Sequence, residues 1–289
     1  MGRTTSRWYL ALSLFGCLGA HAAAPVWAIH GAHNTVYLAG SVHALAEEDS
    51  ALPAAFDRAY RDSTKVVMEV DLAKLDPMEA GSWMAEHGTL PPGTHLRSLV
   101  GEQTYARVTT AATQFGFPIV ALDHQAPWLV GIELAEHAYE NAGYSGERGV
   151  EEQLVTRLQA DGKASAGLET IQEQLSGLAA LAPEDQVRML EQSLDDLQDV
   201  PGEMKDVVAA WRRGDAGRLA TLLSSEYDAF PALYRPLVTV RNEHWLPQIE
   251  ALLKGGDNVM VVVGSLHLVG KGGLLELLHR DGYTATQLN

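Results

Sequence analysis

The fold is indicated first by Val259-Met260-Val261-Val262-Val263-Gly264-Ser265-Leu266-His267, in which an apolar run leads into a glycine turn and a histidine. Such a run, rich in β-branched residues, is typical of a strand buried on both faces of a sheet. The same Gly-Ser-x-His sequence follows a second strand-like run, 35–39, and ends in His43. Ligand sites of α/β proteins lie where strands end, so we expect both histidines at one sheet edge.

The rest of the chain supplies further sheet segments and a long helical region. Strands are predicted at 26–30, 65–70, 118–123, 163–169 and 283–288, and helices at 51–62, from 76 onward, and at 102–115, 126–141, 149–160 and 273–280. From 171 to 253 apolar residues recur at helical spacing, with no strand pattern. We therefore predict an α/β fold whose mixed central sheet carries both Gly-Ser-x-His turns, with a helical insertion or lid at about 171–253.

Residues 1–22 have the layout of a secretory signal peptide, with Arg3 and Arg7 before an apolar stretch and Ala20-His21-Ala22 at the cleavage site. The apolar stretch is shorter than the roughly 20 residues of a membrane span, and no later stretch qualifies. We expect a domain of residues 23–289 in the periplasm or outside the cell. Lipoprotein processing at Cys17, the sole cysteine, is the alternative.

The composition argues against one class of partner and limits the chemistry of any metal site. The formal net charge is −16 at pH 7, and no basic strip with aromatic residues offsets it, so we expect no nucleic-acid binding. If Cys17 leaves with the signal peptide, metal ligands must come from His, Glu and Asp.

Several polar residues in these segments are candidates for a site. Glu69 lies in the apolar run 65–70, and a buried carboxylate needs a cation, a metal or a proton as partner. Glu69 is thus a structural ion pair with Arg241, a metal ligand or a general base. Glu169 ends a predicted strand and serves either as a second carboxylate or as a helix cap. The serine of each Gly-Ser-x-His sequence either caps the next helix, which is the favoured role, or hydrogen-bonds a group of the site.

Two other pairs of residues have weaker signals. Asp123 and His124 follow the predicted strand 118–123, and a position at the cleft is the less favoured interpretation of this pair. Trp211 and Trp245 fall at helical spacing and are expected in the core.

The chain resembles the TraB/GumN family over nearly all of residues 23–289. The motifs that carry the resemblance are Tyr37 to His43, Val67 to Asp71, Leu168 to Gln174, Trp211 to Asp215, Arg241 to Trp245 and Val263 to Gly270. The resemblance implies a fold related to the erythromycin-esterase and haem-binding ChaN-like proteins. It also implies a metal-dependent hydrolase site of His43, His267, Glu69 and Arg241. Many relatives have Gly-x-Asp where this chain has Gly146-Glu147-Arg148-Gly149, so the resemblance supports no role for that aspartate here.

Our leading hypothesis from the sequence is an exported metal-dependent hydrolase that acts on a peptide or a small molecule. His43, His267 and Glu69 would hold a divalent ion such as Mn, Co or Zn, and Arg241 would stabilise the oxyanion. Two alternatives remain open at this point. One is a non-catalytic module that binds haem or a peptide. The other is a metal-free, esterase-like hydrolase in which a histidine is the base.

Overall fold

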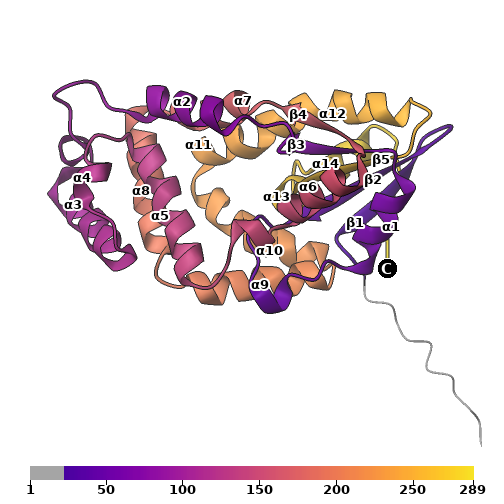
Figure 1. Cartoon of the computed structure of the whole chain (residues 1–289), viewed down its shortest axis with the longest axis horizontal. Coiled ribbons are helices and arrows are strands. Elements are labelled where there is room, and N and C mark those ends of the chain that lie inside the picture. Colours follow the sequence, from indigo (N-terminus) through magenta and orange to yellow (C-terminus); the bar gives the residue numbers. More distant parts are fainter. Residues whose placement is uncertain (1–22) are drawn as a thin grey trace, which may run out of the picture.

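The computed structural model describes residues 23–289, apart from the side chains of 224–229. The predicted signal peptide and Cys17 lie outside the described residues. A sheet occupies one end of the molecule, and a helical part extends from it (Figure 1). Within 23–289, no helix combines the length and the apolar character needed to cross a lipid bilayer.

The sheet has six strands in the order β4-β3-β5-β2-β1-β6. Their bounds are β1 (Val26–His30), β2 (Thr35–Ser41), β3 (Lys65–Val70), β4 (Ala164–Glu169), β5 (Val259–Gly264) and β6 (Ala285–Gln287). Strands β4, β3, β5 and β2 run parallel, whereas β1 pairs antiparallel with β2 and β6. Every residue of the central strand β5 is buried, as its apolar sequence predicts. The mixed α/β sheet, built from both ends of the chain, is confirmed.

The helices divide into those that share the main hydrophobic core with the sheet and those of the helical part. The first set is α1 (Ala54–Asp62), α6 (Val150–Asp161), α9 (Val200–Arg212), α10 (Ala216–Ala229), α12 (Val240–Leu253), α13 (Ser265–Leu268) and α14 (Leu274–Arg280). The others are α2 (Pro77–Gly88), α3 (Leu96–Phe115), α4 (Ile119–Leu122), α5 (Pro127–Asn141), α7 (Ile171–Ala179), α8 (Pro183–Asp196), α11 (Pro231–Tyr234) and the π-helical turn η3 (Arg235–Thr239). Trp211 and Trp245 are fully buried in the main core, as expected.

The structure corrects the prediction of a strand at 118–123. This segment is the single helical turn α4, in which the N–H of Asp123 donates to the carbonyl oxygen of Ile119 at 3.1 Å. Its buried residue Leu122 packs with apolar side chains of α3, α5 and α8, and no described strand lies among them. A run of four apolar residues fits a helical turn as well as a strand, and the helical neighbours decide between them.

The two Gly-Ser-x-His segments join each other directly. His267 lies in the short helix α13, whereas His43 lies in the loop after β2. The Ser265 hydroxyl donates to the backbone oxygen of Ser41 at 2.9 Å, so the prediction that this serine caps a helix is wrong. Close approach also explains Gly40, where a Cβ would lie 2.8 Å from the Ser265 Oγ.

Candidate functional site

Four neighbouring strands end at the same edge of the sheet and bring the predicted site residues together. Glu169 ends β4, Glu69 lies next to the end of β3, and His267 and His43 follow β5 and β2. Because the four strands are parallel, their carboxyl ends meet at one edge. Arg241 is the second residue of α12 and reaches the same edge from the first turn of this helix.

A cavity of about 1390 Å³ lies between this sheet edge and the helical part. His43, His267 and Arg241 line it on the sheet side, while α5, α9, α10 and η3 supply other walls. Asp123 and His124, for which a position at the cleft was the less favoured interpretation, do not line it.

His43 is oriented by a carboxylate that the sequence analysis did not identify. Its Nδ1 lies 2.8 Å from Oε1 of Glu151, the second residue of α6. The Glu151 side chain is only 11% exposed, whereas that of His43 is 68% exposed and faces the cavity. The adjacent charge of Glu151 raises the pKa of His43 above its ordinary 6.5. Burial opposes ionisation of Glu151, but His43 lowers the pKa of this carboxyl below 4.5.

All three nitrogens of the Arg241 guanidinium contact protein acceptors. Nε donates to Glu169 at 2.9 Å, and Nη2 donates to Glu69 and lies 2.7 Å from Glu169 in an ion pair. Nη1 donates to the Leu237 carbonyl oxygen at 3.1 Å and to Nε2 of His267 at 3.2 Å. These partners within the protein engage the guanidinium that was expected to stabilise a substrate oxyanion. In this arrangement Arg241 holds two buried carboxylates and one imidazole in place.

The two carboxylates beside Arg241 differ in their ionisation. Burial alone would raise the pKa of Glu69, but His267, Arg241, His43 and the Gly264 amide lower it to about 2. The pKa of His267 is lowered to about 4 and that of His43 is raised to about 9, so near pH 7 Arg241, protonated His43 and the Gly264 amide carry this effect on Glu69. For Glu169 burial prevails over the same arginine and raises the pKa above 4.5. Its oxygens accept from Arg241 and, at 3.1 Å, from the Trp245 indole, while Thr170 and Glu173 cap α7. Glu169 therefore belongs to the site and does not cap the helix.

His267 is a neutral imidazole whose tautomer is fixed by its neighbours. The Asn242 amide nitrogen donates to two carbonyl oxygens, so its Oδ1 must accept from Nδ1 of His267, at 2.8 Å. Nε2 then carries the lone pair that accepts from Arg241. Burial lowers the pKa of His267 to about 4, because the charged form would lose its water.

His43 and Glu69 face each other across Gly264. A Cβ built on Gly264 would lie 3.3 Å from both Nε2 of His43 and Oε1 of Glu69. The Gly264 N–H donates to the same Oε1 at 2.6 Å. Both atoms therefore lie on the side of Gly264 that a Cβ would face, and a water molecule between them, clear of the Gly264 Cα, would contact an imidazole and a carboxylate.

The predicted metal ligands satisfy only part of what a metal site requires. Each imidazole has its Nδ1 held by an acceptor, Glu151 or Asn242, as in metal-bound histidines. However, the Arg241 cation occupies the lone pair of His267 and contacts Glu69. We also compared the distances between donor atoms of His, Asp and Glu side chains in the described part of the chain. The donor atoms of His95, Asp123 and His124 all lie within 4.8 Å of one another, whereas those of His43, Glu69 and His267 do not form such a group.

Comparison with known proteins places the chain in a family. The model of the TraB/PrgY/gumN family matches residues 25–287. The chain belongs to this family. It is 22% identical over 242 residues to the uncharacterized protein YbaP of Escherichia coli K12 and of Shigella flexneri, a match that covers 84% of this chain and 87% of YbaP. No solved structure matches, so the relation to erythromycin-esterase and ChaN-like folds stays a prediction.

The sequence signal for Glu151 is a Gly-x-acid tripeptide at the start of α6. It reads Gly149-Val150-Glu151. Gly149 is required there, since a Cβ would overlap with the carbonyl oxygen of His43. The missed signal was therefore this tripeptide, and its acid binds the first Gly-Ser-x-His histidine.

Proposed function

We propose that this TraB/PrgY/gumN-family protein is a hydrolase in which His43 activates a water molecule beside Gly264. The observation that carries the proposal is that His43 Nε2 and Glu69 Oε1 converge on one side of Gly264 at the cavity, each 3.3 Å from a Cβ built on that glycine. Glu69 accepts one hydrogen bond from the water and orients it. Neutral His43 takes a proton as the water oxygen attacks the scissile carbonyl carbon, and later gives that proton to the leaving group. Arg241 is a positioning residue.

Filling the position beside Gly264 tests this proposal. We expect Gly264→Ala to lower hydrolysis of fluorogenic peptides by about 10²–10⁴-fold, because the new methyl group displaces the water that His43 must deprotonate. The backbone of Gly264, at φ −50° and ψ 138°, suits alanine, so the fold should persist. Gly81→Ala is the matched control, since nothing lies within 4 Å of its added Cβ. Wild-type turnover in Gly264→Ala would contradict the proposal.

The pH dependence of turnover tests the role of Glu151. His43 must be neutral to accept a proton, so turnover should rise with pH through a pKa above 6.5. Glu151→Gln removes the charge that raises this pKa, and we expect the rising limb to move to lower pH. A full pH profile of kcat/KM measures the shift. A lower rate with an unmoved limb would show that Glu151 serves only the stability of α6.

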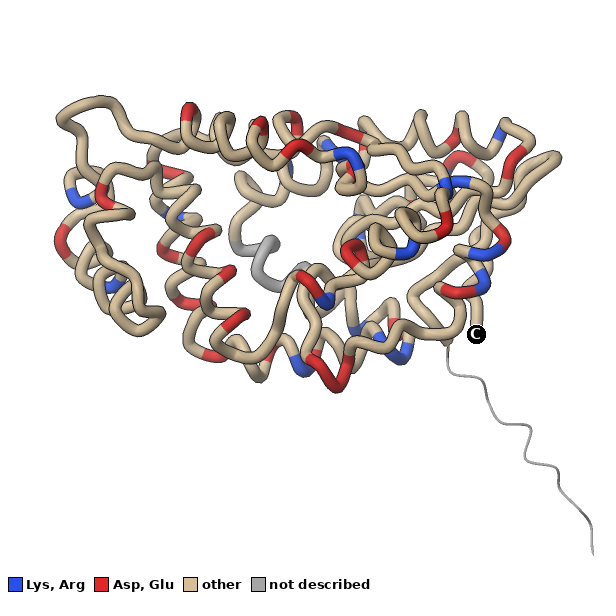
Figure 2. Tube along the Cα trace, viewed as in Figure 1, with Lys and Arg blue, Asp and Glu red and all other residues tan. Residues whose placement is uncertain are grey.

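The charge of the cavity favours cationic substrates. Six carboxylates line it, from Glu136, Glu140, Glu147, Asp199, Glu203 and Asp206, against one guanidinium, Arg241. Acidic positions along α5 are visible in Figure 2. A cleft lined by one sign of charge concentrates ligands of the opposite sign. We therefore assign cationic peptides as the substrate class. The protein would meet these peptides after the signal peptide proposed for residues 1–22 has directed its export.

Matched peptides test the substrate class. We expect a lysine-flanked peptide to be hydrolysed with at least about tenfold higher kcat/KM than its glutamate-flanked counterpart at low salt. The ratio should fall towards one at high salt, because salt screens the field of the cavity. Equal turnover of both peptides at low salt would overturn the assignment, and binding without turnover of either would favour a non-catalytic binding module.

A metal-dependent version is the second candidate, favoured by the two imidazoles whose Nδ1 atoms are already held. His43, His267 and Glu69 would be the ligands, and Arg241 would have to leave His267. A divalent ion there would lower the pKa of a bound water. A chelator distinguishes the candidates: turnover that persists supports His43 as the base, whereas loss that Mn²⁺, Co²⁺ or Zn²⁺ restores supports the metal.

A further inference from the structure

A second group of ligand-type side chains lies at the far end of the helical part. His95 directly precedes α3, Asp123 directly follows α4, and His124 is the next residue. Their donor atoms all lie within 4.8 Å of one another. Nδ1 of His95 is 2.8 Å from Oδ2 of Asp123, and the two imidazole rings are 5.0 Å apart between centroids.

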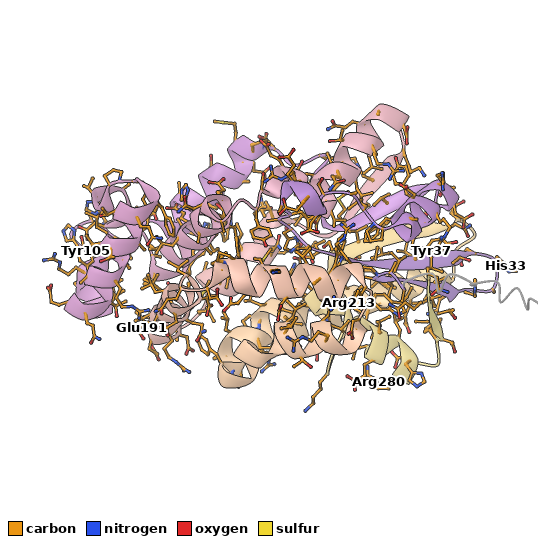
Figure 3. The ribbon with its side chains drawn as sticks, turned by 90° about the horizontal axis from the view of Figure 1, so that it is seen from below. His33, Tyr37, Tyr105, Glu191, Arg213 and Arg280 are labelled. Carbon is orange, nitrogen blue, oxygen red and sulfur yellow. The ribbon has the colours of Figure 1, made fainter. Side chains whose placement is uncertain are left out.

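This group is remote from the cavity. None of its three residues lines the cavity. Helices α3 and α4 lie at the opposite end of the molecule from the sheet (Figure 1). Tyr105 is a neighbour of Asp123, whose charge contributes to the raised pKa of Tyr105. In Figure 3, Tyr105 lies at one end of the molecule and His33 of the β1–β2 turn lies at the other.

The backbone fixes the segments that carry the three residues. The N–H of Leu96 donates to the carbonyl oxygen of Asp123, and the N–H of Leu90 donates to that of His124, both at 2.8 Å. The N–H of Ala126 donates to the carbonyl oxygen of Gly88 at 2.7 Å. These bonds clamp the chain before α3 against the chain between α4 and α5. A ligand that uses His95, Asp123 and His124 therefore meets side chains whose Cα positions are already set.

One oxygen of the group lacks a partner. Oδ1 of Asp123 is buried and accepts no hydrogen bond, although buried carboxylate oxygens ordinarily do. The His95–Asp123 ion pair uses only Oδ2. The exposed imidazole of His124 has a donor nitrogen within 4.8 Å of this carboxylate. Tyr105 is a further neighbour of the carboxylate, so the case for a ligand rests on the buried Oδ1 and the nearby second imidazole.

We propose that His95, Asp123 and His124 bind a divalent transition-metal ion of the Zn²⁺ type, independently of the hydrolase site. Two imidazoles and one carboxylate suit Zn²⁺, Ni²⁺ or Cu²⁺, whereas Mg²⁺ and Ca²⁺ prefer oxygen ligands alone. Zn–ligand bonds of about 2.0–2.1 Å in a tetrahedron place donors about 3.3 Å apart. The observed spacings reach this geometry through small side-chain movements. Water would complete the coordination, and the ion would link α3 to the segment before α5.

Titration of the purified protein with Zn²⁺ tests the site. We expect one saturable binding event, weakened at least tenfold in His95→Ala, His124→Ala and Asp123→Asn. Zn²⁺ should also raise the melting temperature of the wild type but not that of His124→Ala. His137→Ala is the matched control, because His137 is an exposed histidine of the same helical part, paired with Glu140 at 3.3 Å. It should bind Zn²⁺ as the wild type does.

Two further variants separate this site from the hydrolase site. His43→Asn and His267→Asn should retain the binding event, whatever they do to peptide turnover. Co²⁺ in place of Zn²⁺ adds a spectroscopic readout, since tetrahedral Co²⁺ absorbs visible light and the band should vanish in His124→Ala. Wild-type Zn²⁺ affinity in both His95→Ala and His124→Ala would overturn the proposal. So would the absence of saturable binding in the wild type.

Discussion

Replacing His43 with asparagine is expected to lower peptide turnover by about 10²–10⁴-fold, the contribution typical of a positioned general base. The asparagine amide nitrogen stands where Nδ1 of His43 stood and can still donate to Glu151, so the buried carboxylate keeps a partner. The nitrogen that takes the proton, Nε2, has no counterpart in asparagine. Because the His43 side chain is 68% exposed, the variant should fold and melt like the wild type.

Turnover of fluorogenic peptides and thermal unfolding, measured on the same preparation, check this prediction. His279→Asn is the control for an exposed histidine outside the cavity lining, and it should be fully active. Full activity of His43→Asn would remove His43 from the reaction and with it the proposed mechanism. Loss of activity that accompanied a large fall in melting temperature would mean that Glu151 had lost its partner instead.

Replacing Arg241 with methionine should cost about 3–5 kcal/mol of unfolding free energy, because it leaves buried charge without a counter-ion. The side chains of Glu69 and Glu169 are each only 9% exposed, and Arg241 binds both. Methionine fills similar space but offers neither charge nor N–H donors. Urea unfolding measures the loss, and Arg280→Met, at a 65% exposed side chain, should change stability by no more than about 0.5 kcal/mol.

The cost of Arg241→Met should depend on pH in a defined direction. In the wild type the pKa of Glu69 is about 2, below its unfolded value near 4.5. Its ionisation therefore stabilises the folded state above pH 4.5, and this stabilisation is lost as the pH falls towards 2. Without Arg241 the pKa of Glu69 rises, so the difference between wild type and variant should be largest near pH 7 and shrink on acidification. A difference that stays constant from pH 7 to about 3 would show that lost packing, not lost charge, is the cause.

Much of the sheet could be predicted because its strands carry their own local signal. The buried run of β5 and the apolar residues around Glu69 in β3 identify strands without knowledge of their neighbours. The repeated Gly-Ser-x-His then predicts both histidines at the strand ends. The segment 118–123 has no such signal, since four apolar residues suit either a strand or a helical turn, and the contacts of Leu122 with the helical part settled it.

By itself, the amino-acid sequence determined the α/β class, the six strands of the sheet and the expectation that His43 and His267 meet at one sheet edge, because strands that end at the same edge carry the residues after them to the same place. Only the tertiary structure excluded a strand at 118–123, added Glu169 to this edge and decided what each of these groups contacts. Glu151 meets His43 across 108 positions, and the guanidinium of Arg241 meets acceptors from four other segments. These contacts depend on the distance and direction between side chains in the folded protein. They follow no periodic pattern and no fixed spacing along the sequence, so the sequence does not predict them.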